Sequence, residues 1–368
     1  MPLFMDRHDI PKEITAEHVA KMHQEDLKVE HLYGCRGITY WCDDQKHHAF
    51  CLIEAPNKEA LQKMHNAAHG DFPHSIIEVD ENLVASFLGR IEDPENVGNA
   101  SIPIIDDSAF RAIMLIETNN FLNRAEANQL SVFTQKFHRS VMNTLKKYNG
   151  TIVKQNDCTY LVSFESVSNA VFAALKLQSN IKFVTPKIDM GSRKVNIAIG
   201  SGTPVTTKDG LFEEVIAFTT RMCEVVKSEI VLSNEVHHLF SIENRAFQLD
   251  KKVVRVLTPK EEQFLTVLMD HIEAIWKSPN IKVEDLSLKL GYSKSQLNRK
   301  LKALTNTSPN NFVRDVKLNR SLSLFQKQLN NISEVAFEVG FNSPAYFTKC
   351  FHEKFGISPS KYTQQHIF

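Results

Sequence analysis

Histidines gather near the N-terminus in a pattern that could bind a metal ion. Nine of the fifteen histidines lie between His8 and His74. His65 and His69 are four positions apart, so a helix would project both imidazoles from one face, and His8 on a preceding strand offers a third. Neutral imidazole binds nickel, copper and zinc. The spacing makes His8, His65 and His69 candidate ligands of a divalent transition metal, with ordinary surface histidines as the alternative.

Side chains near the C-terminus could contact DNA. They lie on the outward faces of two predicted helices, and comprise Ser295, Gln296, Asn298, Arg299 and Lys302 on the first and Ser343, Ala345, Thr348, Lys349 and His352 on the second. Most of them can donate hydrogen bonds to base edges or phosphates. Residues 280–368 contain 13 Lys and Arg against 6 Asp and Glu, whereas residues 1–100 contain 9 against 18. The net charge of zero therefore combines a basic C-terminal end with an acidic N-terminal end.

The elements that would hold these DNA-facing side chains occur twice. Each copy has apolar residues at helical spacing before a glycine, either Gly291 or Gly340, which lies where a helix C-terminus favours positive φ. Ser293 or Ser343 can then cap a second helix. A helical run over residues 311–329 joins the copies. Two copies in register favour a pair of helix-turn-helix units over a helical bundle whose polar residues merely face water.

This stretch resembles the AraC-type DNA-binding domain. The matching pieces are residues 290–302, 308–309, 335–343, 346–347 and 355–359. The resemblance implies two recognition helices that enter successive major grooves of double-stranded DNA, and RNA polymerase as a possible partner. Pro344 and Ala345 depart from a polar pattern, so we expect base reading to depend more on the first copy.

Composition is typical of an ordinary globular protein. At 368 residues the chain has room for two or three domains, with 42% hydrophobic and 23% charged residues. We find no apolar run long enough for a bilayer and no signal-peptide pattern at the start. The six cysteines lack CxxC spacing, which indicates reduced thiols. We therefore expect a cytoplasmic protein without membrane association.

The first 85 residues predict an α+β domain. Strands are expected at Leu3–Asp9, 37–42, His48–Glu54 and Ser75–Val79, with helices at 15–33 and Lys58–Ala68. The order βαββαβ is the ferredoxin-like arrangement. This domain, residues 1–85, resembles a small family of nickel-binding ferredoxin-like proteins through residues 1–8, 40–42, 50–56 and 65–70. The resemblance implies metal binding, with nickel or another divalent transition metal, but no particular reaction.

A middle α/β domain is predicted over residues 108–250. Residues 81–108 are rich in turn and breaker residues, and we expect a linker near 90–108. Strands are then expected at 112–117, 151–154, Thr159–Phe164 and 195–201, with helices at 126–148 and 170–181. The frame resembles the class III adenylate/guanylate cyclase domain through residues 116–121, 149–153, 156–157, 173–178 and 199–205.

The catalytic positions of that family are largely lost. A cyclase of this class needs two aspartates for two metal ions; Glu117 stands at the first position, and Asp157 at the second follows Asn156 where the family has glycine. Ala217 replaces the transition-state asparagine, although Arg221 keeps the arginine position. The base-selecting lysine position is Val153. We expect no cyclase activity and no catalytic residue, and we assign no nucleotide cofactor, with nucleotide binding without turnover and a role as a dimer interface left as alternatives.

The remaining stretch completes a three-domain prediction. Residues 241–265 indicate a last strand, a linker and a helix capped by Thr258, after which residues 262–368 form an all-α double helix-turn-helix domain. The favoured interpretation is a transcription regulator with sensor modules ahead of a DNA-binding domain. A homodimer through the N-terminal or middle domain is possible. The alternatives are a nucleotidyl cyclase with a DNA-binding tail and a metal-buffering protein.

Overall fold

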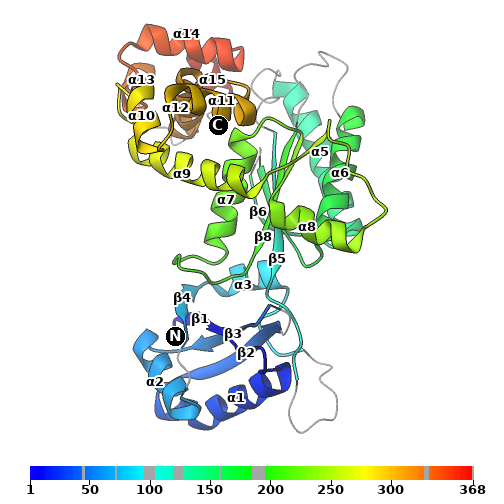
Figure 1. The fold of residues 1–368 in the computed structure, drawn as a ribbon. Coiled ribbons are helices and arrows are strands. Elements are labelled where there is room, and N and C mark those ends of the chain that lie inside the picture. Colours follow the sequence, from blue (N-terminus) through cyan, green and yellow to red (C-terminus); the bar gives the residue numbers. More distant parts are fainter. Residues whose placement is uncertain are drawn as a thin grey trace.

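The computed structural model shows three units that follow one another along the chain and pack together (Figure 1). It describes residues 1–43, 46–70, 73–94, 104–118, 127–156, 159–184, 195–326 and 331–366. In that part of the chain, no helix is both long enough and apolar enough to span a bilayer.

The N-terminal unit has the predicted order βαββαβ. Its elements are β1 (Leu3–Asp9), α1 (Ala16–Val29), η1 (Glu30–Leu32), β2 (Arg36–Asp43), β3 (His48–Glu54), α2 (Lys58–Ala68) and β4 (Ser75–Val79). The sheet order is β2-β3-β1-β4, with every neighbouring pair antiparallel. The first helix is shorter than predicted because the chain tightens into the 3₁₀ turn η1 before β2.

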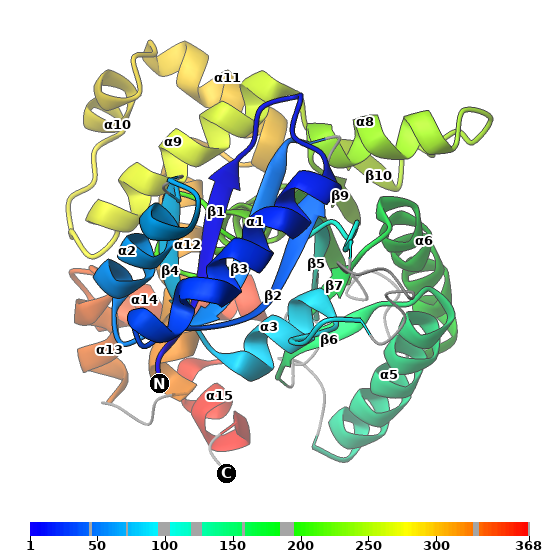
Figure 2. The ribbon, with the colours of Figure 1, turned by 90° about the horizontal axis from the view of Figure 1, so that it is seen from below.

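The two faces of this sheet are covered by different parts of the chain. Helices α1 and α2 cover one face, as Figure 2 shows from below. The other face packs on the helix α3 (Glu81–Leu88) and on the middle unit. The fully buried side chains that form this second contact include Met5, Trp41, Phe50, Leu52, Val84, Ile113 and Phe212. One apolar core therefore runs from the first unit into the second.

Helix α3 corrects the prediction of an irregular transition over residues 81–108. Asp80 caps it by accepting a hydrogen bond from the Leu83 amide at 3.0 Å, and Gly89 ends it at φ +82°. Val84, Phe87 and Leu88 are spaced as an apolar helix face and are buried. A helix of two turns is too short to show a clear apolar period in the sequence. The loop-forming residues that follow it therefore determined the prediction.

The middle unit is a mixed sheet between helices. Its elements are β5 (Arg111–Glu117), α5 (Ala127–Lys147), β6 (Thr151–Gln155), β7 (Thr159–Phe164), α6 (Val167–Val184), β8 (Asn196–Gly202), α7 (Glu213–Val225), β9 (Ile230–Leu232), α8 (Asn234–Glu243) and β10 (Val254–Val256). The order is β10-β9-β8-β5-β7-β6, parallel from β8 to β10 and antiparallel elsewhere. Helices α5, α6 and α8 cover one face, whereas α3 and α7 pack on the other.

The C-terminal unit is entirely helical. It comprises α9 (Pro259–Ile275), α10 (Val283–Lys289), α11 (Lys294–Thr305), α12 (Pro309–Gln326), α13 (Ile332–Glu338), α14 (Pro344–Phe355) and α15 (Pro359–His366). Thr258 caps α9 in a reciprocal capping box with Glu261. The first three helices share an apolar core with α7 and the strands beneath it. Helices α13 to α15 have a separate core with the end of α12.

Candidate nucleic-acid interface and metal centre

Both helix-turn-helix turns have the predicted glycine geometry. Gly291 lies at φ +71° and Gly340 at φ +74°. This region of backbone conformation disfavours residues other than glycine. After each glycine a serine begins the next helix. Ser293 accepts a hydrogen bond from the Gln296 amide at 3.2 Å, and Ser343 accepts one from the Tyr346 amide at 3.3 Å. These caps fix the N-termini of α11 and α14.

Helix α11 has a buried stripe and an exposed polar face. Leu297 and Leu301 are fully buried, because they pack on the core shared with the middle unit. The side chains predicted to contact DNA are all exposed: Ser295, Gln296, Asn298, Arg299 and Lys302. Gln296 also accepts a hydrogen bond from the Ser293 amide at 2.9 Å, so its carbonyl oxygen is already engaged in the cap.

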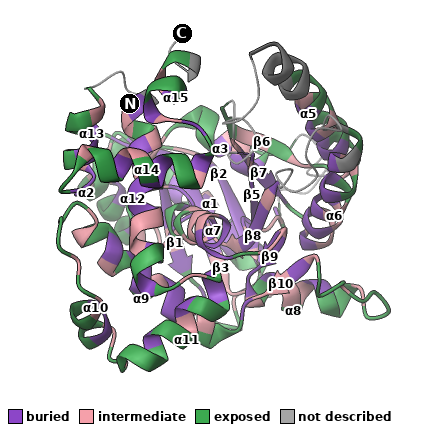
Figure 3. Cartoon of the chain, turned by 90° about the horizontal axis from the view of Figure 1, so that it is seen from above, coloured by how far each residue is buried: buried purple, intermediate pink, exposed green. Residues whose placement is uncertain are grey.

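Helix α14 repeats this arrangement, and Figure 3 shows both helices with outward faces at the surface. Its predicted DNA-facing residues Ser343, Ala345, Lys349 and His352 are exposed, and Thr348 is half-buried. Among the described residues, neither Arg299 of α11 nor Lys349 forms an ion pair. These cations are therefore available to an anionic partner.

One aromatic residue on the same face was absent from the predicted set. Tyr346 is 53% exposed, and its ring lies 6.0 Å from that of Phe341 in the turn. The sequence signal was an aromatic residue outside the buried stripe of Phe347 and Phe351. Tyr346 adds an apolar surface beside Ala345, where the second helix has no polar side chain.

The three predicted metal ligands lie close together. The ring centroid of His65 is 5.1 Å from that of His8 and 5.2 Å from that of His69. Two carboxylates join them. His65 Nε2 lies 2.8 Å from Asp6 Oδ2, and His65 Nδ1 lies 3.0 Å from Asp26 Oδ1. Asp26 Oδ1 is also 3.2 Å from His69 Nε2.

Three further groups in this cluster were absent from the predicted ligand set. Potential ligand atoms of Asp26, His65 and His69 lie within 4.8 Å of one another, as do those of Asp6, His8 and Cys51. Asp6 and Asp26 come from β1 and α1, whereas His65 lies in α2 and His69 directly follows it, so only tertiary packing brings them together. The cluster is almost wholly buried.

The electrostatics of the cluster are dominated by its carboxylate–imidazole pairs. Burial alone would lower the pKa of His65, but Asp6 and Asp26 raise it to about 10. Burial alone would raise the pKa of Asp6, yet His8 and His65 hold it well below its usual range. Burial raises the pKa of the Cys51 thiol well above its ordinary value, and Asp6 adds to the effect. Without a metal, His65 is therefore an imidazolium held between two carboxylates.

The donor set fits a divalent transition metal. Imidazole, carboxylate and thiol are ligands that such ions accept. Because both ring nitrogens of His65 are hydrogen-bonded to carboxylates, an ion that binds His65 has to replace a proton there. His8 and His69 border His65 on either side and could complete a site with Asp6 or Asp26.

The positions aligned with cyclase chemistry have other contacts here. Arg221 of α7 forms ion pairs with Asp270 and Glu273 of α9, with Nη2 at 2.7 Å and 2.9 Å. Val153 packs against the apolar core between the first two units, and Ala217 is exposed on α7. The Cys223 thiol lies 3.9 Å from Glu117 Oε2. Asp157 lies outside the described residues.

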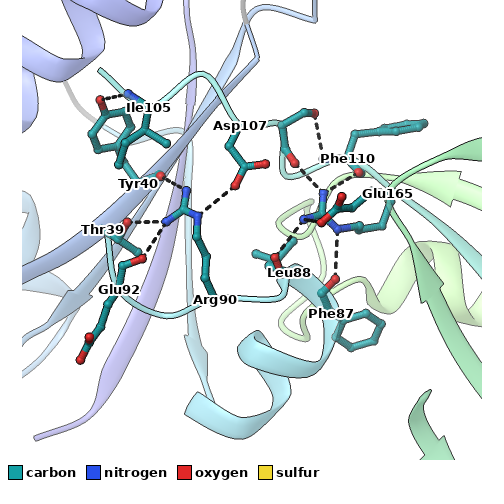
Figure 4. A network of polar contacts seen from close by, with 12 residues as sticks. Thr39, Tyr40, Phe87, Leu88, Arg90, Glu92, Ile105, Asp107, Phe110 and Glu165 are labelled. Carbon is teal, nitrogen blue, oxygen red and sulfur yellow. Dashed lines mark hydrogen bonds and ion pairs between the residues drawn. The ribbon is translucent and has the colours of Figure 1, made fainter. Parts of the chain in front are cut away.

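Two arginines join the first unit to the second (Figure 4). Arg90 donates to the Tyr40 carbonyl at 2.7 Å and to Asp107 Oδ2 at 2.9 Å. Arg111, 2% exposed, donates to the carbonyls of Phe87 and Leu88 at the end of α3, both at 3.0 Å. These bonds satisfy carbonyl groups that a helix end leaves unpaired, so α3 is fixed to both sheets.

Comparison with known proteins identifies the terminal units. Residues 286–365 match the family described as helix-turn-helix domain, and residues 4–79 match the family described as nickel responsive protein SCO4226-like. The chain carries an AraC-type DNA-binding domain. Ahead of it lies a SCO4226-like domain. Both predicted resemblances at the ends of the chain are confirmed, while the middle unit is confirmed as mixed α and β.

Relatives match the chain over different lengths. Histidine kinase P4 of Formosa agariphila is 26% identical over 280 residues, which are 72% of this chain and 20% of that protein. The uncharacterized HTH-type transcriptional regulator YdeC of Bacillus subtilis is 34% identical over 82 residues, which are 22% of this chain and 28% of that protein. The chain thus spans between a fifth and a third of the length of these relatives.

Two solved structures are each similar to a part of the chain. A transcriptional regulator with an AraC-type DNA-binding domain from Chromobacterium violaceum is 24% identical and covers 30% of this chain and 97% of its own, at a TM-score of 0.28. SCO4226 from Streptomyces coelicolor is 35% identical and covers 21% of this chain and 94% of its own, at a TM-score of 0.20.

Proposed function

We propose that this protein is a sequence-specific transcription regulator that binds double-stranded DNA and responds to a transition metal. The observation that carries the proposal is the repeated helix-turn-helix unit, in which buried leucine or phenylalanine stripes leave the outer faces of α11 and α14 exposed. Those faces carry Arg299, Lys302 and Lys349 in a basic region of the chain. Each helix suits a major groove.

The two helices contribute differently to DNA recognition. Arg299 and Asn298 of α11 can form bidentate hydrogen bonds with guanine and adenine edges. On α14 the positions at the same distance from the capping serine are Thr348, which is half-buried, and Lys349, which suits a phosphate. Ala345 and Tyr346, nearer the start of α14, offer apolar contact to thymine methyl groups. Specificity at polar base edges therefore depends mainly on α11.

The middle unit acts as a scaffold, with no catalytic role. A functioning cyclase needs its arginine free to meet the triphosphate, whereas Arg221 is already paired with two carboxylates of α9. Ala217 offers no group to orient a transition state. The mixed sheet and α7 instead support the AraC-type domain through a shared apolar core. Homodimerisation and contact with RNA polymerase remain predictions.

The SCO4226-like domain would hold the metal. His8, His65 and His69 supply imidazole nitrogens, and Asp6, Asp26 and Cys51 border them. A bound divalent ion would replace the proton on His65 and draw α2 toward β1 and α1. Regulation additionally requires that the ion bind one conformation of the protein more tightly than another. A metal-buffering protein would lack this last property.

Selection of bound duplexes by the full-length protein tests these proposals together. The protein is mixed with random-sequence duplexes at two salt concentrations, with and without nickel, and the bound fraction is sequenced. Enrichment of a two-part sequence, for which the affinity of the protein falls steeply as the salt concentration rises, supports the role as a DNA-binding regulator. Absence of any enriched sequence overturns it. Enrichment that is identical with and without nickel, in a protein that binds nickel, leaves DNA binding intact but refutes metal response.

A further inference from the structure

A buried lysine joins the two halves of the AraC-type domain. Lys317 lies in the middle of α12 and is 5% exposed. Its Nζ donates to the Ser278 carbonyl at 2.6 Å and to the Gly340 carbonyl at 2.8 Å. Ser278 follows α9 and precedes the first helix-turn-helix unit, whereas Gly340 is the turn glycine of the second. One ammonium group thus joins the segment that leads into the first unit to the turn of the second unit.

Burying this ammonium group costs free energy that its contribution to local stability does not offset. Burial lowers the pKa of Lys317, and among the described residues no carboxylate forms an ion pair with it. An apolar side chain of similar length would avoid the desolvation of a charge. What the lysine adds is a fixed geometry between the backbone carbonyl of Ser278, which precedes the first unit, and that of Gly340 in the second.

The backbone around the turn glycine of the second unit is packed too closely to accept a side chain there. A Cβ added at Gly340 would lie 2.5 Å from the Lys277 carbonyl oxygen and 2.8 Å from Lys317 Nζ. A Cβ added at Gly291 would meet nothing within 4 Å. The two glycines have nearly equal φ angles, +74° and +71°. Only the second turn is packed directly against the contact that Lys317 makes.

The two units are otherwise anchored in different ways. The first unit shares its core with the middle unit, whereas α13 to α15 form their own core with the end of α12. Lys354 of α14 adds a polar bond to the Asp315 carbonyl of α12, at 2.8 Å. The position of the second unit relative to the first is therefore set along α12.

We propose that Lys317 fixes the separation of α11 and α14 and thereby selects the spacing between the two halves of the DNA site. This inference rests on the proposed function. Lys317 is a positioning residue: it is buried away from the exposed faces that would meet DNA. Its loss should alter which spacing is bound, a change that a purely stabilising residue would not produce.

The test uses the full-length protein and the duplex selected by the wild type. Binding is measured to that duplex and to versions with one base pair inserted or deleted between its halves. For the wild type, either change should weaken binding by about tenfold or more, because one unit loses its base contacts. For K317M the same changes should weaken binding less than about threefold. A K317M profile that parallels the wild type, at any overall affinity, overturns the inference.

The glycine pair gives a matched control that keeps the lysine. G340A should flatten the spacing profile as K317M does, because the added methyl group would displace the Lys277 carbonyl and Lys317 Nζ from the turn. G291A carries equal backbone strain without the collision and should keep the wild-type profile. Circular dichroism confirms folding, and if K317M does not fold, the two alanine variants decide. Identical profiles for G340A and G291A refute the inference, whereas failure of the wild type to select any duplex refutes the proposed function.

Discussion

Arg221 of α7 and Asp270 of α9 form an ion pair, with 2.7 Å between Nη2 and Oδ1, that joins the middle unit to the DNA-binding domain. Glu273 completes the contact at 2.9 Å. The arginine side chain is 14% exposed, while the two carboxylates are 61% and 42% exposed. The guanidinium is thus enclosed between helices, and its removal leaves only solvated acids behind.

Replacing Arg221 with methionine should destabilise the packing of α7 on α9. We expect a loss of about 0.5–1.5 kcal/mol in the free energy of unfolding, since the bonds are charge-assisted but their acceptors remain hydrated. Urea denaturation of the full-length protein measures it. Arg245→Met, an exposed arginine after α8, is the control. Equal stability of the two variants would contradict the structural role of the ion pair.

The middle unit should form no cyclic nucleotide from ATP or GTP with magnesium or manganese. Arg221 is engaged by α9 and Ala217 carries no hydrogen-bonding side chain, so the transition state has no support. Chromatography of overnight reactions detects the product. Turnover that is present in the wild type and absent from Asp157→Ala would show that catalysis survives.

Replacing Arg299 with alanine should weaken binding to the selected duplex by about 1–3 kcal/mol and relax the base preference at one position. Lys302→Ala should instead weaken binding to all duplexes alike. It should also reduce the slope of log affinity against log salt concentration by roughly one. Arg139→Ala on α5 serves as the control. Titration at two salt concentrations separates the cases. An Arg299→Ala protein that keeps the wild-type ratio between selected and random duplexes would exclude base reading by this residue.

Replacing His65 and His69 together with alanine should abolish tight nickel binding by the full-length protein. These residues are the centre of the buried cluster, and without them Asp26 loses both imidazoles of its ligand group, so only Asp6, His8 and Cys51 remain grouped. Calorimetry measures the binding. The double variant His237→Ala and His238→Ala on α8 removes the same number of imidazoles elsewhere. Nickel binding unchanged from wild type would eliminate the helical pair as ligands.

The half-buried Lys354, whose side chain is 21% exposed, predicts a specific dependence of stability on pH. Burial lowers its pKa from 10.5 to about 8, against a smaller opposing effect of Asp315. Between pH 8 and 10.5 the unfolded chain therefore holds a proton that the folded chain has lost, so the free energy of unfolding rises with pH, by at most about 3 kcal/mol. Below pH 8 the penalty for the buried charge is fully present.

Comparison of Lys354→Met with the wild type isolates this effect. The difference in unfolding free energy between wild type and Lys354→Met should grow in favour of the wild type from pH 8 to 10.5. Lys349→Met, on the same helix but exposed, should show a constant difference. A constant difference for Lys354→Met as well would mean that its ammonium is solvated in the folded protein.

Local patterns predicted what depends on local interactions. The stripes around Leu297 and Phe347, together with glycines and capping serines, specify each helix-turn-helix unit within about 25 residues, so its turns and exposed faces follow from sequence. The histidine pair at 65 and 69 was likewise evident from helical spacing. Both features depend on contacts between residues that are near in the chain.

Contacts between distant segments escaped prediction. Asp26 reaches His65 only because α1 lies beside α2 on the sheet, and no spacing relates two residues 39 positions apart. Arg221 retains a cyclase position in sequence, yet its partners lie 49 and 52 residues further on. The burial of Lys317 was equally invisible, because a lysine on a long amphipathic helix ordinarily faces water.

The apolar core that crosses from the first sheet to α3 and β5 limits how this protein can be divided. A fragment ending at residue 85 would cut α3 and leave Trp41, Phe50 and Leu52, each at most 1% exposed in the whole chain, open to water. Such a fragment would self-associate or aggregate. A transplantable metal-binding part would instead have to include α3 and the strand that bears Arg111. The range that matches the SCO4226-like family, residues 4–79, is therefore shorter than the part of this chain that would fold alone.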